Sequence, residues 1–461
     1  MSLNPRRVHF VGIGGAGMSA IARVLLELGY RVSGSDLKKS AITDKLQARG
    51  AKVFYEHSAA NLGDAEMVVV STAIPAENEE VVEARRRGLP VIPRAEMLAR
   101  LMKYQQGIAI AGAHGKTTTT AMMALLLEKT GLDPTYIIGG EVSDLGGNAK
   151  AGGGDYLVAE ADESDGSFML LEPAVAVVTN VENDHLDYYR NIENIQKAFR
   201  SFLNRLPSEG LAVLCYDDPF LRELASKIPV RTITYGLDEN ADYVIRNFAP
   251  NGVISGADIY YCKEKLGRLE LAVPGVHNVL NATAVVAVGR YLGLEFNEIA
   301  PVLKTFRGVK RRFQLIGESC GVHIIDDYAH HPTEIKATLA AARYKKPKRV
   351  IAVFQPHRYT RTFHLYKEFG KAFDDADIVL INEIYSAGEK PIKGVGARLI
   401  VDAIRKHGHK CPQLFASQEE LVTHLMGILE PGDMVLTMGA GDIWQSGVAV
   451  LQRLEAKNAA I

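Results

Sequence analysis

The chain contains the stretch Ile108-Ala109-Ile110-Ala111-Gly112-Ala113-His114-Gly115-Lys116-Thr117-Thr118-Thr119-Thr120. Its apolar first part predicts a buried strand, its glycines predict a turn, and its threonines predict the start of a helix. Backbone N–H groups at such a helix start converge on an anion, Lys116 reaches the β- and γ-phosphates, and the Thr117 hydroxyl is placed to ligate Mg²⁺. The stretch therefore predicts a phosphate-binding loop in an α/β domain.

The glycine spacing of this loop, G-x-x-G-K-T, is shorter than the common G-x-x-x-x-G-K-[ST] pattern. The alternative is a tight turn that carries a surface lysine. The buried strand before the loop and the helix after it favour the phosphate site.

Composition excludes several classes of protein. The chain has 461 residues, of which 47% are hydrophobic and 23% charged, and this length predicts about three domains. A net charge of -1 argues against nucleic-acid or anionic-membrane binding, because both require a basic surplus. No apolar run approaches the ~20 residues of a membrane span, and the N-terminus lacks the apolar segment of a signal peptide. We therefore expect a cytoplasmic protein with no nucleic-acid or membrane partner.

Strand and helix signals alternate in three segments, which predicts an α/β fold with parallel sheets. The expected domains are a Rossmann-like N-terminal domain over 1–106, a central P-loop ATPase-type α/β domain over 107–310, and a C-terminal Rossmann-like α/β domain over 311–461. The junctions fall near 95–107 and 295–311. The four cysteines lie far apart without C-x-x-C spacing, which indicates neither a zinc site nor a disulfide framework.

A second glycine loop, residues 12–19, follows the predicted strand 8–11. It has the G-x-G-x-x-G spacing at Gly12, Gly14 and Gly17 and is followed by a helix. Such a loop holds a pyrophosphate at a helix N-terminus, and Asp36 ends the next strand, where an acidic group often meets a ribose. The pattern is typical of a dinucleotide or a nucleotide-sugar diphosphate; the alternative is a turn for close helix packing. Two phosphate loops in one chain indicate that two phosphorylated molecules are brought together.

Acidic clusters follow two further predicted strands, at 160–168 and 180–187. Ligands of an open α/β sheet lie outside such strand ends, so both clusters are expected to face the phosphate loop. Mg²⁺ prefers hard oxygen ligands beside nucleotide phosphates. Glu160 and Thr117 are the first choices, and His185 is a further candidate. The alternative for either cluster alone is a solvated acidic loop.

Polar residues also mark the start of one helix and the edge of the third sheet. His277, Asn278 and Asn281 open a helix with amides suited to an adenine or ribose edge, although the asparagines could simply cap that helix. In the third segment, arginines and histidines follow the predicted strands, and Arg358 or Arg361 could grip a small carboxylate bidentately.

Taken together, these motifs resemble those of the Mur ligases over essentially the whole chain. The resemblance is carried by residues 12–19, 112–119, 160–168, 180–187, 277–281, 311–313, 326–334, 354–362 and 439–443. It implies an N-terminal UDP-sugar domain, a central ATPase and a C-terminal domain that holds an amino acid.

The resemblance also implies site residues. For ATP these are Gly112, His114, Gly115, Lys116, Thr117, Thr118, His277, Asn278, Asn281, Arg311, Arg312 and Asp326. For the UDP-sugar they are Gly14, Gly15, Ala16, Gly17, Met18, Ser19, Asp36 and Ser71. For the amino acid they are Tyr328, His330, His357, Arg358 and Arg361. The metal ligands are Thr117, Glu160 and His185, and the catalytic residues are Lys116, Glu160, His185 and His330.

Some positions depart from the family pattern. Ala113 and Ala329 replace a frequent threonine and a frequent glycine, and neither change removes a required functional group. Several relatives use a carbamylated lysine after the D-H-x-D motif, but this register falls at Arg200, one helical turn after Lys197. We therefore do not carry the carbamate over.

The implied reaction joins L-alanine to the carboxylate of UDP-N-acetylmuramate in peptidoglycan precursor synthesis. ATP, with Mg²⁺ or alternatively Mn²⁺, activates the carboxylate as an acyl phosphate, and ADP and phosphate are released. His330 is expected to orient or deprotonate the amine. The expected oligomeric state is a monomer or homodimer.

Three alternatives remain at this point. A related ligase would attach a peptide, or glutamate to a folate, in place of L-alanine. An NAD-dependent dehydrogenase would explain residues 8–36 but leave the Lys116 loop unused. A regulatory module would bind ATP without releasing phosphate.

Overall fold

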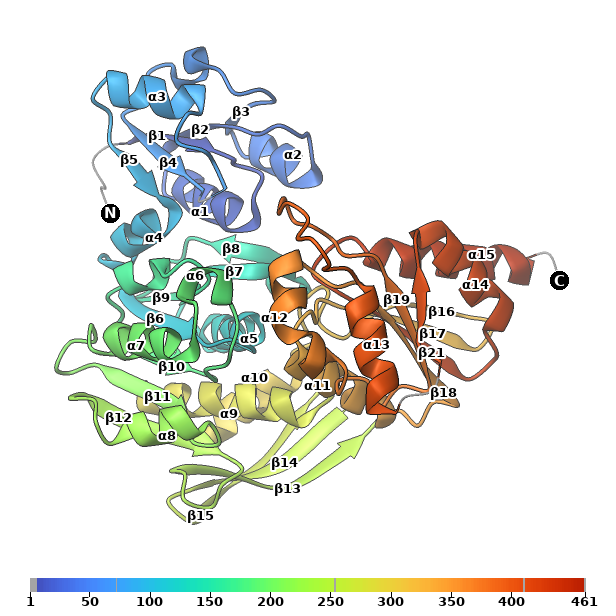
Figure 1. Cartoon of the computed structure of the whole chain (residues 1–461). Helices are drawn as coiled ribbons and strands as arrows, with labels where there is room; N and C mark the ends of the chain where they lie inside the picture. The colour runs from blue at the N-terminus through green and yellow to red at the C-terminus, as the bar shows by residue number, and fades with distance from the viewer. Residues whose placement is uncertain (1–5, 72, 253, 409–410, 460–461) are drawn as a thin grey trace. The chain divides into compact units, whose positions relative to one another are not determined.

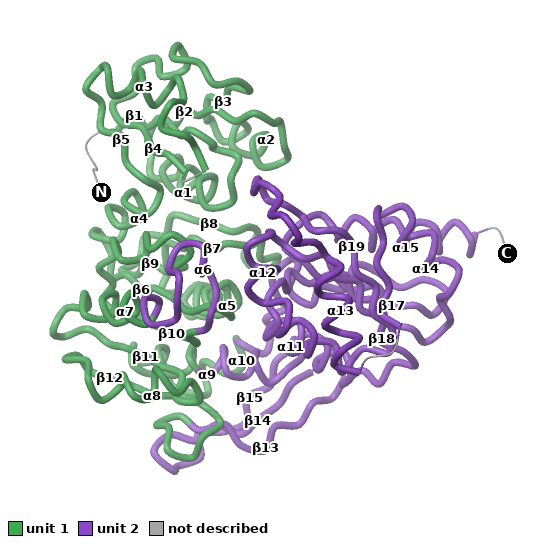
Figure 2. The backbone as a smooth tube through the Cα atoms, in the orientation of Figure 1, with its two compact units in different colours: residues 1–181, 196–243, 284–302 green, residues 182–195, 244–283, 303–461 purple. Residues whose placement is uncertain are grey.

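The computed structural model describes residues 6–71, 73–252, 254–408 and 411–459 of the chain. They fold into two compact units (Figure 2). Unit 1 comprises residues 1–181, 196–243 and 284–302, and unit 2 comprises residues 182–195, 244–283 and 303–461. No helix in the described ranges is long and apolar enough to cross a membrane.

The N-terminal part of unit 1 is a parallel sheet with helices between its strands (Figure 1). The strand order is β3-β2-β1-β4-β5. The order in which strands are added therefore reverses at β1, with β2 and β3 on one side of it and β4 and β5 on the other. Ligands of such sheets bind at this reversal point, where the glycine loop after β1 lies. The elements are β1 (Arg7–Val11), α1 (Ala16–Glu27), β2 (Arg31–Ser35), α2 (Ala41–Ala48), β3 (Lys52–Phe54), β4 (Met67–Val70), α3 (Glu79–Arg86), β5 (Val91–Pro93) and α4 (Arg94–Met102).

The second sheet of unit 1 has the strand order β12-β11-β10-β6-β9-β7-β8. Neighbouring strands are parallel except β7 and β8, which form an antiparallel hairpin. The strands are β6 (Gln106–Ala111), β7 (Thr135–Val142), β8 (Gly147–Lys150), β9 (Tyr156–Glu160), β10 (Val175–Val178), β11 (Leu211–Cys215) and β12 (Arg231–Gly236). Two helices lie wholly in this part of unit 1, α5 (Lys116–Lys129) and α8 (Pro219–Ala225). Three others have residues in both units, namely α7 (Ile192–Leu203), α9 (Val276–Tyr291) and α10 (Phe296–Lys304).

Unit 2 contains a sheet with the order β16-β17-β21-β18-β19-β20, and helices cover both of its faces. Only β16, at its edge, is antiparallel to its neighbour. Its elements are β16 (Gln314–Ser319), β17 (Val322–Asp327), α11 (Pro332–Arg343), β18 (Arg349–Phe354), α12 (Tyr359–Phe369), β19 (Ile378–Asn382), α13 (Arg398–His407), β20 (Gln413–Phe415), α14 (Gln418–Ile428), β21 (Asp433–Met438) and α15 (Trp444–Ala459). The unit also holds α6 (Leu186–Tyr189), β13 (Tyr243–Asn251), β14 (Ile254–Tyr261) and β15 (Glu264–Leu271).

Strand β18 shows why this sheet forms. Val350, Ala352 and Phe354 belong to the apolar cluster on one face, and Ile351 and Val353 belong to the cluster on the other. A strand buried on both faces has a continuous apolar sequence, as Arg349–Phe354 has after its first residue. Covering helices therefore stabilise both faces, and the loops at the strand ends carry the polar residues.

The predicted α/β class with parallel sheets is confirmed. Two elements lie where we expected domain junctions, since α4 and α10 occupy most of 95–107 and 295–311. The hairpin of β7 and β8 was not predicted, because its glycines 139, 140, 146 and 147 break the apolar alternation that indicates a strand.

Candidate active site

The loop after β6 turns sharply before it enters α5. Gly112 has φ +127°, and Gly115, directly before the helix, has φ +85°. Both values lie in the region that glycine adopts far more readily than other residues. A Cβ at Gly112 would overlap the Thr179 hydroxyl. The two glycines therefore allow the backbone N–H groups at the start of α5 to face outward as an anion site.

The segment after β10 holds this loop in its conformation. Thr179 Oγ1 donates to the His114 carbonyl oxygen at 2.5 Å, and Asn180 Nδ2 donates to the same oxygen at 3.1 Å. The His114 backbone N–H donates in return to Asn180 Oδ1 at 2.9 Å. These bonds preorganise the loop backbone, so little reorganisation is needed for a phosphate to bind.

Lys116 lies back over the loop. Its Nζ donates to the Gly112 carbonyl oxygen at 2.6 Å and to Glu163 Oε1 at 2.8 Å. Burial opposes a charge on Lys116, but the carboxylates of Glu163, Asp162 and Glu160 raise its pKa above the ordinary value. The ammonium group is therefore a fixed positive charge at the loop. Glu163 was not among the predicted site residues, although it lies within the acidic run that follows β9.

Thr117 and Glu160 meet beside the same helix start. Thr117 Oγ1 donates to Glu160 Oε2 at 3.2 Å, and the Gly139 N–H donates to Glu160 Oε1 at 2.6 Å. A Cβ at position 139 would lie 2.9 Å from both carboxylate oxygens, so Gly139 lets the carboxylate lie directly against the backbone here. A hydroxyl and a carboxylate form a hard-oxygen donor set that fits Mg²⁺. His185, the third predicted ligand, lies in unit 2, and its part in a metal site stays a prediction.

The N-terminal glycine loop joins β1 to α1. Gly12 has φ +82°. The Gly12 and Ile13 N–H groups donate to the Ser35 carbonyl oxygen at 2.8 and 3.0 Å, and the Gly14 N–H donates to Asp36 Oδ2 at 2.9 Å. Asp36 therefore lies against the loop, at the end of the neighbouring strand.

The other predicted residues of this loop differ in what they present to a ligand. Gly15 and Ala16 are exposed at the start of α1, whereas Met18 and Ser19 are buried. Ser19 donates its hydroxyl to the Ala16 carbonyl oxygen at 3.0 Å and its N–H to the Gly15 carbonyl oxygen at 2.8 Å. Ser71 follows β4, and its Cβ is 3.9 Å from where a Cβ of residue 12 would lie. Ser19 thus supports the helix, and its contact with a sugar stays a prediction.

Arg94, which we did not predict, lies between the start of α1 and the acidic run that follows β9. Its Nη2 donates to Asp162 Oδ2 at 3.1 Å, in the acidic run next to Lys116. A Cβ at Gly17 would be only 2.7 Å from Arg94 Nη1. The third glycine of the G-x-G-x-x-G pattern therefore makes room for a guanidinium group at the start of α1.

One of the three predicted residues at the start of α9 bonds to the loop before the helix. Asn278 Nδ2 donates to the Pro274 carbonyl oxygen at 2.6 Å, which is not a capping bond, so both the adenine contact and the capping role of this amide stay predictions. Asn281 is buried. Burial lowers the pKa of His277 to about 4, assisted by the Arg312 charge, so its imidazole is neutral near pH 7. A neutral ring can stack on or accept a hydrogen bond from a base.

Arg311 and Arg312 face one aromatic ring at the start of the C-terminal sheet. Their guanidinium carbons lie 5.1 and 5.2 Å from the centre of the Tyr328 ring. Arg311 Nε donates to Asp326 Oδ2 at 2.9 Å, and Arg312 Nη1 lies 3.4 Å from Glu334 Oε1. Three of the predicted nucleotide residues thus form one cluster with Tyr328, which we had assigned to the amino acid.

His330 has a defined hydrogen-bonding state. Its Nδ1 lies 3.0 Å from the Tyr328 carbonyl oxygen, which can only accept, so Nδ1 carries the proton and Nε2 is the acceptor. Burial lowers the pKa of His330 to about 4, although Glu334 opposes this change. Burial likewise lowers the pKa of His357, whose ring centre lies 5.9 Å from that of His330, to about 3. Both rings are neutral near pH 7.

The two predicted carboxylate-binding arginines pair with one aspartate just before α6 and one within it. Arg361 donates to Asp184 Oδ1 at 2.8 and 3.2 Å through Nη2 and Nε, and both side chains are 8% exposed. Arg358 donates to Asp187 Oδ2 at 3.2 Å, with side chains 38% and 37% exposed. Burial opposes ionisation of Asp184, but Arg361 and three histidines hold the pKa of this carboxyl well below its usual range.

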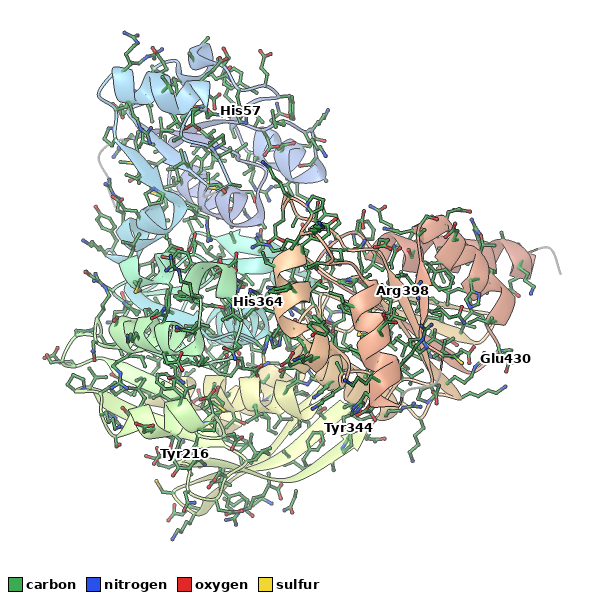
Figure 3. All side chains as sticks on the ribbon, viewed as in Figure 1. His57, Tyr216, Tyr344, His364, Arg398 and Glu430 are labelled. Atoms are coloured by element: carbon green, nitrogen blue, oxygen red, sulfur yellow. The ribbon has the colours of Figure 1, made fainter. Side chains whose placement is uncertain are left out.

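These pairs border a small, partly open cavity in unit 2. His364 of α12 also lines it and is labelled in Figure 3. His185, which precedes α6, lies on the same cavity with φ +53°. Three predicted residues, His185, Arg358 and Arg361, are therefore together in unit 2. Three others, Lys116, Thr117 and Glu160, are together in unit 1.

Comparison with known proteins identifies the family. The Mur ligase family catalytic domain matches residues 7–106, the Mur ligase middle domain matches 110–289, and the Mur ligase glutamate ligase domain matches 311–441. A UDP-N-acetylmuramate--L-alanine ligase of Pelotomaculum thermopropionicum is 59% identical over 451 residues, covering 98% of each chain. The protein of that name from Desulforamulus reducens is 53% identical, again over 98% of each chain.

Solved structures agree with these matches. The crystal structure of a UDP-N-acetylmuramate-alanine ligase from Thermotoga maritima has a TM-score of 0.83 at 31% identity, covering 98% of this chain and 99% of that one. A murein peptide ligase from Psychrobacter arcticus has a TM-score of 0.72 at 25% identity, covering 97% and 98%. The chain, with its phosphate loop before α5 and its second glycine loop before α1, belongs to the Mur ligase family.

Proposed function

We propose that the protein joins L-alanine to the carboxylate of UDP-N-acetylmuramate, using ATP and releasing ADP and phosphate, in the synthesis of peptidoglycan precursors. The observation that carries this proposal is the phosphate loop, in which Lys116 is held against Glu163 and Thr117 against Glu160. Relatives that are 50 to 59% identical over nearly the whole chain are named as ligases of these two substrates. The reaction would take place in the cytoplasm.

The three predicted segments have separate tasks in this proposal. Residues 1–106 would bind the UDP-sugar, residues 107–310 would bind ATP, and residues 311–461 would bind the amino acid. The Gly14–Gly17 loop would face the diphosphate, and Asp36 a hydroxyl of the uridine part.

Phosphoryl transfer comes first, because a carboxylate repels nucleophiles until it is activated. The sugar carboxylate attacks the γ-phosphorus of ATP, the bond from that phosphorus to the bridging oxygen breaks, and an acyl phosphate and ADP result. Lys116 and the N–H groups at the start of α5 face the charge that develops on the phosphoryl oxygens. Thr117 and Glu160 would hold Mg²⁺, which when bound neutralises phosphate charge.

Amide formation follows. The L-alanine amine attacks the acyl carbon, and phosphate leaves as the tetrahedral intermediate collapses. His330 would orient the amine through Nε2, since its Nδ1 proton is committed to the Tyr328 carbonyl oxygen. Its lowered pKa keeps this acceptor unprotonated above about pH 5.

Arg358 is the better candidate to bind the alanine carboxylate. Its ion pair with Asp187 is exposed, and an exposed pair contributes little to stability. Arg361 is buried with Asp184, and removing either partner of a buried pair leaves an uncompensated charge. A substrate carboxylate would therefore displace Asp187 more readily than Asp184.

The test is phosphate release from ATP with UDP-N-acetylmuramate and one acceptor at a time. We expect turnover with L-alanine, and a product whose mass corresponds to the amide. Turnover only with a tripeptide would identify a peptide ligase, the activity of the murein peptide ligase in the structural comparison, and would contradict the proposal. ATP binding without phosphate release in every mixture would identify a regulatory module and would also contradict it.

A further inference from the structure

Glu80 is a fully buried carboxylate in α3 that no step of the proposed reaction uses. Its Oε2 accepts a hydrogen bond from Ser35 Oγ at 2.5 Å, and its Oε1 accepts one from Asn61 Nδ2 at 2.7 Å. His57 Nδ1 and His9 Nε2 lie 3.3 and 3.6 Å from Oε2. His57, in the loop after β3, is labelled in Figure 3. Side chains from β1, from β2 and from the connection between β3 and β4 thus converge on one group.

This carboxylate is ionised. Burial alone would raise the pKa of Glu80, but the neighbouring His9 and hydrogen bonds from Ser35 and Asn61 lower it to about 2. Apolar residues of similar volume often replace a buried charge without loss of stability. A buried, multiply bonded charge is therefore poorly explained by stability alone, and its partners indicate what it does.

The partner that matters is Ser35, the last residue of β2. Its hydroxyl donates to Glu80, while its carbonyl oxygen accepts from the Gly12 and Ile13 N–H groups at 2.8 and 3.0 Å. The next residue, Asp36, accepts from the Gly14 N–H at 2.9 Å. One residue therefore connects the buried carboxylate with the backbone of the glycine loop.

Ser35, His57 and Glu80 have the composition of a hydrolytic triad, but their arrangement excludes that role. The Ser35 hydroxyl donates directly to the carboxylate, and its side chain is fully buried, so no substrate can reach it. The group acts on the loop rather than on a substrate.

We propose that Glu80 is a positioning residue that acts through Ser35 to hold the Gly12–Gly14 loop and Asp36 in the conformation that binds the UDP-sugar. This inference rests on the proposed function, because it requires that the loop binds that substrate. It assigns Glu80 no contact with the sugar, with ATP or with the reacting atoms.

The test compares Glu80→Gln and Ser35→Ala with Glu83→Gln. Glu83 lies in the same helix and also loses an ion-paired charge, here with Arg86 and Arg87 at the surface, so it controls for charge and helix stability. For Glu80→Gln and Ser35→Ala we expect the KM for UDP-N-acetylmuramate to rise about tenfold, with kcat and the KM for ATP within twofold of the wild-type values. Glu83→Gln should leave all three unchanged.

Two results would overturn the inference. One is an unchanged KM for the UDP-sugar in folded Glu80→Gln or Ser35→Ala. The other is a fall in kcat together with a rise in the KM values for both the UDP-sugar and ATP, which would indicate a general structural role. If Glu80→Gln does not fold, Ser35→Ala decides, because it retains the carboxylate and the backbone carbonyl. A wild-type protein that does not bind UDP-N-acetylmuramate in calorimetry would instead contradict the proposed function.

Discussion

The two glycine loops of unit 1 have the same local design but different chemistry. Each follows a buried parallel strand, starts with a glycine at positive φ and ends at the start of a helix. The loop before α5 leads directly into Lys116, which pairs with Glu163, and Thr117, which bonds to Glu160. The loop before α1 instead donates a backbone N–H to Asp36 and rests on the Ser35 carbonyl oxygen.

The two loops therefore differ in the side chains around them rather than in their glycines, and we expect these side chains to decide what each loop binds. A lysine with carboxylates suits a nucleotide triphosphate and its metal ion. A single carboxylate at the end of the next strand suits the hydroxyls of a nucleoside. The comparison predicts that changes in one loop affect one substrate and leave the other unaffected.

The largest expected effect is that of Lys116→Ala. The variant loses a fixed charge aimed at the transferred phosphoryl group, so we expect kcat to fall at least about 100-fold. The affinity for the UDP-sugar, measured by calorimetry, should stay within twofold of wild type. Lys129→Ala, an exposed change at the other end of α5, is the matched control and should have wild-type turnover. A similar loss of affinity for both substrates would show that the loops are not separate.

The next effect concerns stability and the two glycines at positive φ. Gly112→Ala combines φ +127° with an overlap between the new Cβ and Thr179. Gly12→Ala has φ +82° but ordinary contacts of 3.5 Å or more. We expect roughly 3 kcal/mol of lost stability for Gly112→Ala and about 1 to 2 kcal/mol for Gly12→Ala.

Thermal unfolding measures this difference. Gly29→Ala is the control for backbone strain, because Gly29 also has φ +82° and a Cβ there would have no heavy atom within 4 Å. It should match Gly12→Ala. If Gly112→Ala were no worse than Gly29→Ala, the overlap of the new Cβ with Thr179 would carry no cost, and the expected difference between the two loops would be wrong.

The sequence predicted these loops well because both depend on local order: an apolar strand, glycines at fixed spacing and a helix start. The residues that distinguish the loops were harder to predict. Arg94 and Asp162 are 68 residues apart, and Arg361 and Asp184 are 177 apart. No local pattern indicates which distant charges will pair. We predicted that Arg361 could bind the carboxylate of a small substrate, and the sequence did not indicate that it pairs with Asp184. Glu80 was missed because a glutamate in an amphipathic helix normally faces solvent.

A third, smaller effect is expected at Asp36. Asp36→Asn retains an oxygen that can accept from the Gly14 N–H but loses the charge, and charge-assisted hydrogen bonds are about twice as strong as neutral ones. The KM for UDP-N-acetylmuramate should rise about 3- to 10-fold, with the KM for ATP unchanged. Asp44→Asn, an exposed change in α2 next to Lys39, is the control. An altered KM for ATP in Asp36→Asn would contradict the assignment of this loop to the UDP-sugar.

The smallest effect tests Arg94, where the two loops come closest to sharing a residue. In Gly17→Ala the new Cβ would meet the flexible tip of Arg94 at 2.7 Å, which can move, so the lost stability should be below about 1 kcal/mol. In an Arg94→Ala background the same change has no guanidinium to displace, and it should stabilise α1 by up to about 1 kcal/mol, because alanine favours a helix more than glycine. This reversal of sign in thermal unfolding is the coupling between positions 17 and 94. Arg100→Ala, in the same helix with Glu96 as its ion-pair partner, should show no such reversal. Equal effects of Gly17→Ala in both backgrounds would mean that Arg94 is not the reason why position 17 is a glycine. The two loops would then be independent here as well.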